Sequence, residues 1–484
     1  MRIRPLVTAF ALCACAARGE HAAQPGSAPA VSSSLPASAL APSAAAPSAS
    51  ASSKAKGDAD AVVAEALELV ARVRQLPAKK PVPGLRMQRG ELHAEMQRLL
   101  VEETPKEALL GNAELLFALD TVSADFDLES TITKLYAAEL AGFYDPKAQH
   151  MVLATDLGRD AETITLYHEL VHALQDQHFD LGRAFTFRPE ESDVQGALHS
   201  LAEGDATSAM TEIFATARGV PATDIPSSAL RLQAVVLQAA PDSAQVPGII
   251  ARSMIAPYAD GLDFVRYLRE HQGGFAGVNQ AFEKPPISTE QILHPQKYLT
   301  HEPVEPLPAP AAPPSFSGGV FRDVMGEQGL RLLFEEWAPA SDAARAASDW
   351  GADRIAVFSQ GDTRVVRWHL VFDTEAAAQR AAVLFARGAL RAERPDGASA
   401  EATATPKSGD VRLRPFVPRA EAEAAVRAGR LCRPRAERGS FAIVRRGRHI
   451  GVTLGPYLRG ATSVRLGDTC PQALGWAELV ANQR

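Results

Sequence analysis

Two histidines and a glutamate stand close together in the segment from Thr165 to Leu181, TLYHELVHALQDQHFDL, in the order H-E-x-x-H. If this segment is a helix, His168 and His172 lie one turn apart on the same face, where two imidazoles can reach one Zn²⁺ ion. Glu169 then lies beside the ion and can take a proton from a water molecule that the metal makes more acidic. The pattern predicts peptide-bond hydrolysis at a zinc site, provided that a third protein ligand lies elsewhere in the chain.

Three residues are candidates for that third ligand. His178 follows His172 by six residues, but six residues of an unbroken helix turn by about 600°, which carries His178 off the metal-facing side. His199 and Glu203 lie four residues apart in a second segment expected to be helical, residues 192–217, and so share one face. The residues alone leave the choice among these three open.

The stretch HELVHALQDQ followed by EGDA resembles the gluzincin clan of metallopeptidases, in the form shared by its peptidase-MA-like members. In that clan, a glutamate on a following antiparallel helix completes the zinc site. The resemblance implies that Glu203 binds Zn²⁺ together with His168 and His172. It also implies that His199, one turn from Glu203, contacts a ligand or the substrate.

The region around Tyr258 carries a second resemblance. IAPYADGLDFVRYL, from Ile255 to Leu268, is similar to the Y-x-x-G segment of gluzincin aminopeptidases, whose tyrosine donates a hydrogen bond to the oxyanion formed during hydrolysis. This implies the same role for Tyr258; a tyrosine that only packs at the start of a helix is the alternative. His199, His294 and Tyr298 are the competing candidate donors.

Two further segments, STEQILHPQKY and ELAGFYDP, resemble parts of a little-characterised group of predicted bacterial and archaeal zinc peptidases. This resemblance extends over about residues 90–300, and more loosely over the stretches GLRLLFEEW and WGADRIAVF. It indicates kinship and does not identify a substrate.

The chain has 484 residues, of which 46% are hydrophobic and 22% charged, and its net charge is −7. This length and composition predict a globular protein with more than one domain. The chain has no long basic block, and basic residues do not alternate with aromatic ones. We therefore expect no nucleic-acid partner.

The N-terminus predicts export and a membrane anchor. Residues 1–15 combine two arginines with a short apolar stretch, as in a secretory signal, and end in LCAC, which resembles the lipobox of bacterial lipoproteins. Lipidation of Cys15 is the expectation, and a plain signal peptide cleaved near Ala17 is the alternative. Residues 16–57 are rich in Ala, Ser and Pro and are expected to be a disordered tether. The predicted location is the cell envelope.

The rest of the chain is expected to have an α+β fold in two parts. Residues 301–319 hold six prolines, which neither a helix nor a central strand accommodates, and are interpreted as a linker. Residues 58–300 are expected to form a mainly helical, zincin-like metallopeptidase domain with one hairpin that turns at residues 145–147. Residues 320–484 are expected to form a smaller α+β accessory domain with strands that turn at residues 361–362.

Two cysteines, Cys432 and Cys470, remain in the C-terminal part. In an oxidising compartment they can form one disulfide, and two buried free thiols are the alternative.

Together these features predict zinc-dependent hydrolysis of a peptide or protein substrate at the cell envelope, with Glu169 as general base. An endopeptidase is favoured because no motif for binding a free amine is evident. A non-catalytic binding or assembly lipoprotein with a vestigial metal site is the alternative. The intact Glu169 favours the enzyme, since a purely structural zinc site usually has a fourth protein ligand instead of an open position.

Overall fold

The computed structural model describes residues 49–139, 141–184, 186–224, 226–228, 246–391, 416–435, 437–458 and 469–483. The lipobox with Cys15, and most of the expected tether, lie outside the described residues. Helix α1 begins at Ala49, within the last part of the segment expected to be a tether. No proline follows Pro47 until Pro77, and the intervening Ala and Lys residues favour helix, so the helix extends back into this segment.

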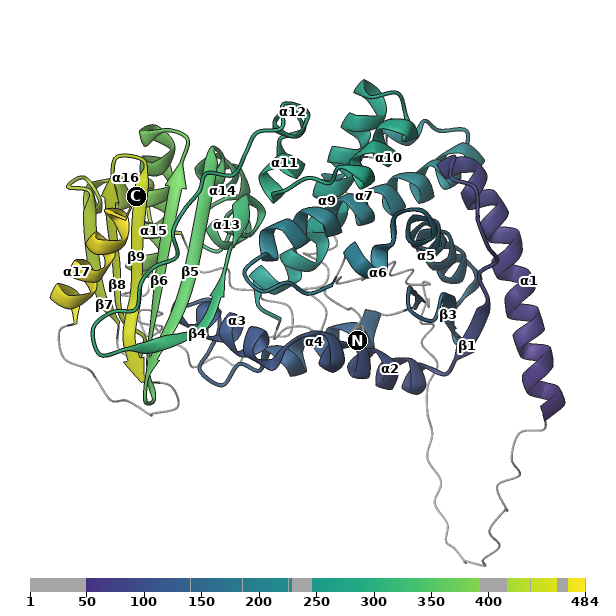
Figure 1. The fold of residues 1–484 in the computed structure, drawn as a ribbon, viewed down its shortest axis with the longest axis horizontal. Coiled ribbons are helices and arrows are strands. Elements are labelled where there is room, and N and C mark those ends of the chain that lie inside the picture. Colours follow the sequence, from purple (N-terminus) through teal and green to yellow (C-terminus); the bar gives the residue numbers. More distant parts are fainter. Residues whose placement is uncertain are drawn as a thin grey trace, which may run out of the picture.

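The first part of the chain is mainly helical and includes one small sheet (Figure 1). Its elements are α1 (Ala49–Arg74), β1 (Gly84–Met87), α2 (Arg89–Glu103), α3 (Lys106–Ala118), α4 (Leu128–Glu139), β2 (Gly142–Asp145), β3 (His150–Ala154), α5 (Arg159–Phe179), α6 (Leu181–Ala184), α7 (Ser192–Ala217), the 3₁₀ turn η1 (Ala222–Asp224), α9 (Gly248–His271), α10 (Phe275–Glu283), α11 (Thr289–Leu293) and α12 (Pro295–Leu299).

The second part of the chain contains a large sheet and five helices among the described residues. Its elements are β4 (Ser317–Asp323), α13 (Gly326–Phe334), α14 (Ala340–Ala347), β5 (Trp350–Gln360), β6 (Thr363–Phe372), α15 (Glu375–Arg391), α16 (Arg419–Ala425), β7 (Arg430–Arg435), β8 (Gly439–Arg446), β9 (His449–Leu458) and α17 (Cys470–Ala481). The expected α+β class, a helical region followed by a domain that combines a sheet with helices, is confirmed.

The small sheet places an edge strand beside helix α5. Its order is β1-β3-β2, with β1 parallel and β2 antiparallel to β3, so β2 is an edge strand. The β2–β3 hairpin turns where expected, because the Asp145 carboxylate accepts hydrogen bonds from the amides of Lys147 and Ala148 at 2.8 and 3.0 Å. Strand β2 therefore has a fixed position against the helix that carries the H-E-x-x-H sequence.

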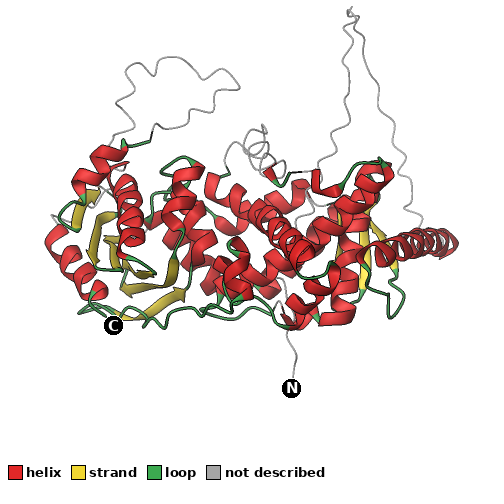
Figure 2. Ribbon diagram, turned by 90° about the horizontal axis from the view of Figure 1, so that it is seen from above, coloured by secondary structure: helices red, strands yellow, loops and turns green. Residues whose placement is uncertain are grey.

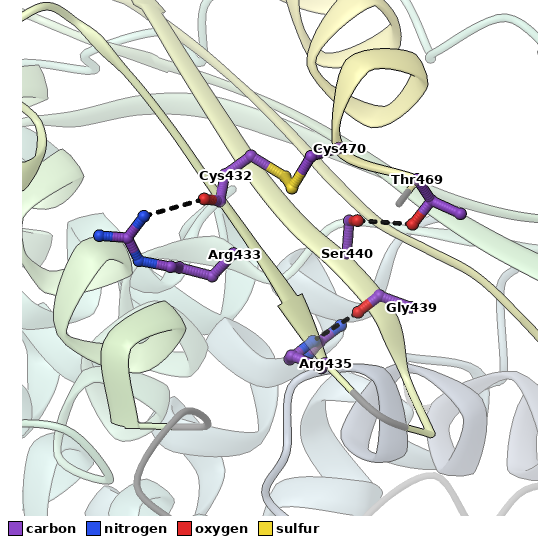
Figure 3. Close-up of a disulfide and its surroundings, with 7 residues drawn as sticks. All are labelled: Cys432, Arg433, Arg435, Gly439, Ser440, Thr469 and Cys470. Atoms are coloured by element: carbon purple, nitrogen blue, oxygen red, sulfur yellow. Dashed lines mark hydrogen bonds between the residues drawn. A yellow bond between two sulfur atoms is a disulfide. The ribbon is translucent and has the colours of Figure 1, made fainter. Parts of the chain in front are cut away.

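The large sheet is antiparallel, with the order β4-β5-β6-β9-β8-β7. The strand pair expected to turn at residues 361–362 is present, because β5 joins β6 through Gly361. Strand β8 joins β9 in the same way through Gly447, and both glycines have positive φ. Helix α17 packs on one face of the sheet, and α15 contacts the same strands from the other side (Figure 1). Of the two alternatives that the sequence left open for Cys432 and Cys470, the structure has the disulfide, which joins β7 to the first residue of α17 (Figure 3).

One continuous apolar core joins the two parts of the chain. It contains side chains from α2, α3, α4 and α9 together with side chains from α13, α15 and the large sheet. Viewed from above, the large sheet lies at one end of the molecule and the small sheet toward the other, with helices between them (Figure 2). Residues 301–316 form neither helix nor strand, but the helices of the first part still pack directly on the second.

Helix α3 provides one of these contacts. Arg435 donates to the Ala118 carbonyl at 2.6 Å and Arg438 donates to the Phe117 carbonyl at 2.9 Å, so two cations bind the C-terminal carbonyls of α3. Within the described residues, none of the helices has the length and apolar character that a bilayer span requires.

Candidate metal centre

Helix α5 presents His168, Glu169 and His172 as a buried group. The helix runs unbroken from Arg159 to Phe179, because no glycine or proline interrupts it and two acidic residues stabilise its first turn. The three residues are 2%, 2% and 8% exposed, and one potential ligand atom from each lies within 4.8 Å of the others. This arrangement could hold a metal ion, as the sequence predicts.

Helix α7 brings Glu203 to the two histidines. The Glu203 Oε2 atom lies 3.0 Å from His168 Nε2 and 3.4 Å from His172 Nε2, and the two Nε2 atoms lie 3.2 Å apart. Glu203 is 1% exposed. Two nitrogens and one oxygen therefore form a compact triangle in the interior of the protein.

The dimensions of this triangle fit Zn²⁺. Ligand atoms that lie 2.0–2.1 Å from a tetrahedral ion are about 3.3 Å apart. The sides of 3.0, 3.2 and 3.4 Å match that spacing. Two imidazoles and one carboxylate are also a ligand set typical of catalytic zinc, which leaves a fourth position open.

Glu169 is oriented by the edge strand of the small sheet. Its Oε2 atom accepts a hydrogen bond from the backbone amide of Tyr144 in β2 at 3.0 Å. Among the described residues, none hydrogen-bonds to its buried Oε1 atom. The carboxylate thus has one oxygen fixed to the backbone and one available to a molecule that enters the site.

Gln175 determines which nitrogen of His172 faces the triangle. The Gln175 Nε2 group donates to the Ala202 carbonyl at 3.1 Å and to Asp205 at 2.8 Å, so its Oε1 atom faces His172 Nδ1, at 2.9 Å. An amide oxygen only accepts, and His172 must therefore carry its proton on Nδ1. In the neutral ring this leaves Nε2 with a lone pair, as metal binding requires.

Asp205 is in turn held by Arg74 of helix α1. The Arg74 Nε atom lies 2.6 Å from the Asp205 carboxylate, and both side chains are fully buried. Arg74 also donates to Asn279 at 2.8 Å. A chain of buried contacts thus runs from α1 through Asp205 and Gln175 to His172.

The two glutamates of the site have different electrostatic surroundings. Burial raises the pKa of the Glu169 carboxyl, and the charges of His172 and His168 offset only part of this effect. Burial also acts to raise the pKa of Glu203, but His172 and hydrogen bonds from the surrounding histidines hold that pKa well below its ordinary value. For His172, burial lowers the pKa, whereas Glu203 raises it, with a net value of about 9.

His199 and Tyr258 border the site. His199 Nε2 lies 3.2 Å from the second oxygen of Glu203, so His199 orients the carboxylate and does not enter the triangle. The Tyr258 ring, from α9, lies alongside the His168 ring, with centroids 5.8 Å apart and planes 29° apart. Both residues therefore lie next to the buried group that could hold a metal ion.

Three other residues considered from the sequence have partners elsewhere. His178 lies in the last turn of α5, 2.7 Å from the Pro77 carbonyl. His294 pairs with Glu327 at 2.8 Å. The Tyr298 hydroxyl donates to the Lys284 carbonyl at 2.9 Å.

Two glycines allow α7 and α9 to meet at the site. A Cβ atom on Gly204 would lie 2.1 Å from the carbonyl carbon of Gly261, and a Cβ on Gly261 would lie 1.8 Å from the carbonyl oxygen of Ser200. The two helices therefore touch backbone to backbone beside Glu203 and Tyr258. These are the glycines of the sequences EGDA and YADG, which explains why each sequence requires one.

Several contacts of the site were not predicted from the sequence. Gln175 follows His172 by three residues and so lies on the same face of the helix, a signal that could have identified it. Asp205 also belongs to EGDA, but it follows Glu203 by two residues, a spacing that places it on a different face of α7 and gives no such signal. Arg74 and the Tyr144 amide come from distant segments, and nothing in their local sequence indicates a contact with the site.

A family described as a domain of unknown function (DUF8575) matches residues 315–430. That range covers less than half of the chain and contains none of the residues of the triangle. Comparison with curated proteins and with solved structures gave no match. The evidence for a candidate metal site in this chain is therefore the geometry of the buried residues themselves.

Proposed function

We propose that this protein is a zinc-dependent peptidase whose metal ligands are His168, His172 and Glu203. The observation that supports this most strongly is the triangle of two Nε2 atoms and one carboxylate oxygen, because its sides fit tetrahedral zinc. The adjacent Glu169, which is not needed as a ligand, supports catalysis over a structural role. The observation is a buried group of residues that could hold a metal ion, and the zincin-like peptidase function is what we propose for it.

A zinc ion held by these residues would polarise a carbonyl oxygen and lower the pKa of water to about 7. In this proposal Glu169 accepts the proton at Oε1, because its Oε2 atom already accepts a hydrogen bond from the Tyr144 amide. The same carboxyl can then deliver the proton to the departing amine. His199 keeps the Glu203 carboxylate in position through its other oxygen.

The metal is tested on the purified protein. We expect about one zinc ion per chain by elemental analysis, and loss of most of it in Glu203→Ala, because two histidines alone leave the ion with two protein ligands. His178→Ala, on the same helix as both histidines, serves as the control and should retain its zinc. A normal zinc content in Glu203→Ala would remove this residue from the ligand set.

The activity is tested by digestion of a broad peptide library. The wild-type protein should cleave internal peptide bonds, a strong chelator should abolish cleavage, and added zinc should restore it. If the protein binds zinc but cleaves no peptide, the alternative of a binding or assembly protein with a vestigial site is favoured.

Tyr258 is the proposed donor to the oxyanion, since its ring lies beside His168. We expect Tyr258→Phe to bind zinc normally and to lose about 10²–10³ in turnover, the usual effect of removing one such donor. Tyr298→Phe is the control, because the Tyr298 hydroxyl already donates to the Lys284 carbonyl. Near-normal turnover in Tyr258→Phe, with a large loss in His199→Ala, would transfer the role to His199.

A further inference from the structure

Helix α13, in the range matched by DUF8575, reaches helix α9 beside the metal centre. Arg331 of α13 donates to both oxygens of Asp260 in α9, at 3.2 and 2.6 Å. Gln328, one turn earlier, donates to the same carboxylate at 2.8 Å. Asp260 is 2% exposed, so these are buried, charge-assisted contacts between the two parts of the chain.

Asp260 lies at the point where α9 touches α7. It directly precedes Gly261, and it follows Tyr258 by two residues. Gly261 is the residue that contacts the backbone of α7 at Gly204, next to the ligand Glu203. Interactions that fix the position of Asp260 therefore also fix the contact between Gly261 and Gly204, which determines the position of Glu203.

Helix α13 is itself fixed to the large sheet. The buried Asp353 carboxylate of β5 accepts hydrogen bonds from the amides of Met325 and Gly326, at 3.0 and 2.9 Å, at the start of α13. It also accepts from the indole groups of Trp350 and Trp368, at 3.0 and 2.9 Å. Four donors on one carboxylate give α13 a defined position relative to the sheet.

We propose that the domain matched by DUF8575 positions the metal centre, with Arg331 and Gln328 as positioning residues that act through Asp260 on the Gly261–Gly204 contact. The C-terminal part is then a component of the metal site and not a separate accessory domain. This inference rests on the metal-binding part of the proposed function and is independent of whether the protein cleaves peptides.

The test compares zinc affinity in matched variants. Removal of Arg331 alone would leave the buried negative charge of Asp260 without the guanidinium that balances it, and would strongly destabilise the protein. The double variant Asp260→Asn/Arg331→Met removes both charges together and keeps an acceptor for Gln328. We expect it to fold, to bind zinc at least ten-fold more weakly in competition with a chelator, and to change the absorption spectrum of bound Co²⁺. Losses of 10–100-fold are typical when residues that orient metal ligands are removed.

The control variant is Arg252→Met. Arg252 also joins α9 to the end of α13, through Glu335 at 3.2 Å and through Glu336, but it lies six residues before Tyr258. We expect this variant to lose stability while it keeps wild-type zinc affinity. If instead it weakens zinc as much as the double variant does, general loss of packing is the cause and the inference is wrong.

A second variant, Arg331→Lys, covers the case in which the double variant does not fold. Lysine keeps the charge but loses the two-point contact with Asp260, so a smaller loss of zinc affinity is expected. The inference would be overturned if a folded double variant kept wild-type zinc affinity and an unchanged Co²⁺ spectrum. It would also be overturned if Arg331→Lys kept wild-type zinc affinity. Neither result would contradict the proposed function. A wild-type protein that binds no zinc would overturn both the inference and the proposed function, whereas zinc binding without cleavage would overturn only the peptidase.

Discussion

Glu169→Gln is expected to retain its zinc and to lose about two to four orders of magnitude in peptide hydrolysis, the range for removal of a general base. The substitution keeps the shape of the side chain and an oxygen that can accept from the Tyr144 amide. It removes the basic oxygen that takes the proton. The measurement is turnover on a peptide identified in the library digest, together with zinc content.

Glu162→Gln is the matched control for this prediction. Glu162 lies on the same helix, but it pairs with Arg86 away from the metal centre, so its loss should leave turnover unchanged. Loss of zinc from Glu169→Gln would show that Glu169 is itself a ligand, and the roles of Glu169 and Glu203 would then have to be exchanged. Full activity with normal zinc content would refute the general-base role.

The local features of the site were predictable because they depend on short-range periodicity. His168 and His172 share a face of α5, and His199 and Glu203 share a face of α7, because residues four apart on a helix point in the same direction. The β2–β3 hairpin was predictable from its Asp145 turn, since an aspartate accepts from its own following amides. The strand pairs of the large sheet followed from alternating apolar residues around a glycine turn.

The contacts between distant segments were not predictable in this way. Arg74 reaches the site across more than one hundred residues of sequence, and its neighbours on α1 show only an ordinary apolar pattern. The proline-rich segment suggested two separate domains, but the apolar residues of α2–α4 pack with those of the large sheet in one core. A linker in the sequence shows where regular structure stops, and it does not show whether the elements on either side pack together.

The requirement for Gly204 also depends on a distant segment. On α7 alone, alanine would be preferred at this position, because glycine within a helix costs about 0.5–1 kcal/mol relative to alanine. The disadvantage of a Cβ atom at this position comes from Gly261, whose backbone on α9 lies too close to α7 to leave room for it. The glycine of EGDA was therefore visible in the sequence, but its physical reason was not.

Gly204→Ala is accordingly expected to abolish zinc binding. The new Cβ would lie 2.1 Å from the Gly261 carbonyl carbon, and carbon atoms at optimal separation are about 3.5–4.0 Å apart, so the helices must separate locally by about 1 Å or more. Zinc sites tolerate about 0.2 Å in their ligand distances, so this displacement of Glu203 exceeds the tolerance several-fold. The cost of overpacking, about 1–3 kcal/mol or more, also exceeds the gain in helix propensity. The protein should therefore unfold at a lower temperature.

Gly475→Ala is the control that separates these effects. Gly475 is exposed on α17, and a Cβ there would meet no atom within 4 Å. That variant should keep its zinc and become slightly more stable, since only the helix-propensity effect remains. Zinc affinity and thermal unfolding are measured on both variants. Gly204→Ala could lower the unfolding temperature and still bind zinc as tightly as the wild type. That result would mean that the contact between α7 and α9 stabilises the fold without positioning Glu203. Helix α13 could then not affect the metal ligand through Gly261.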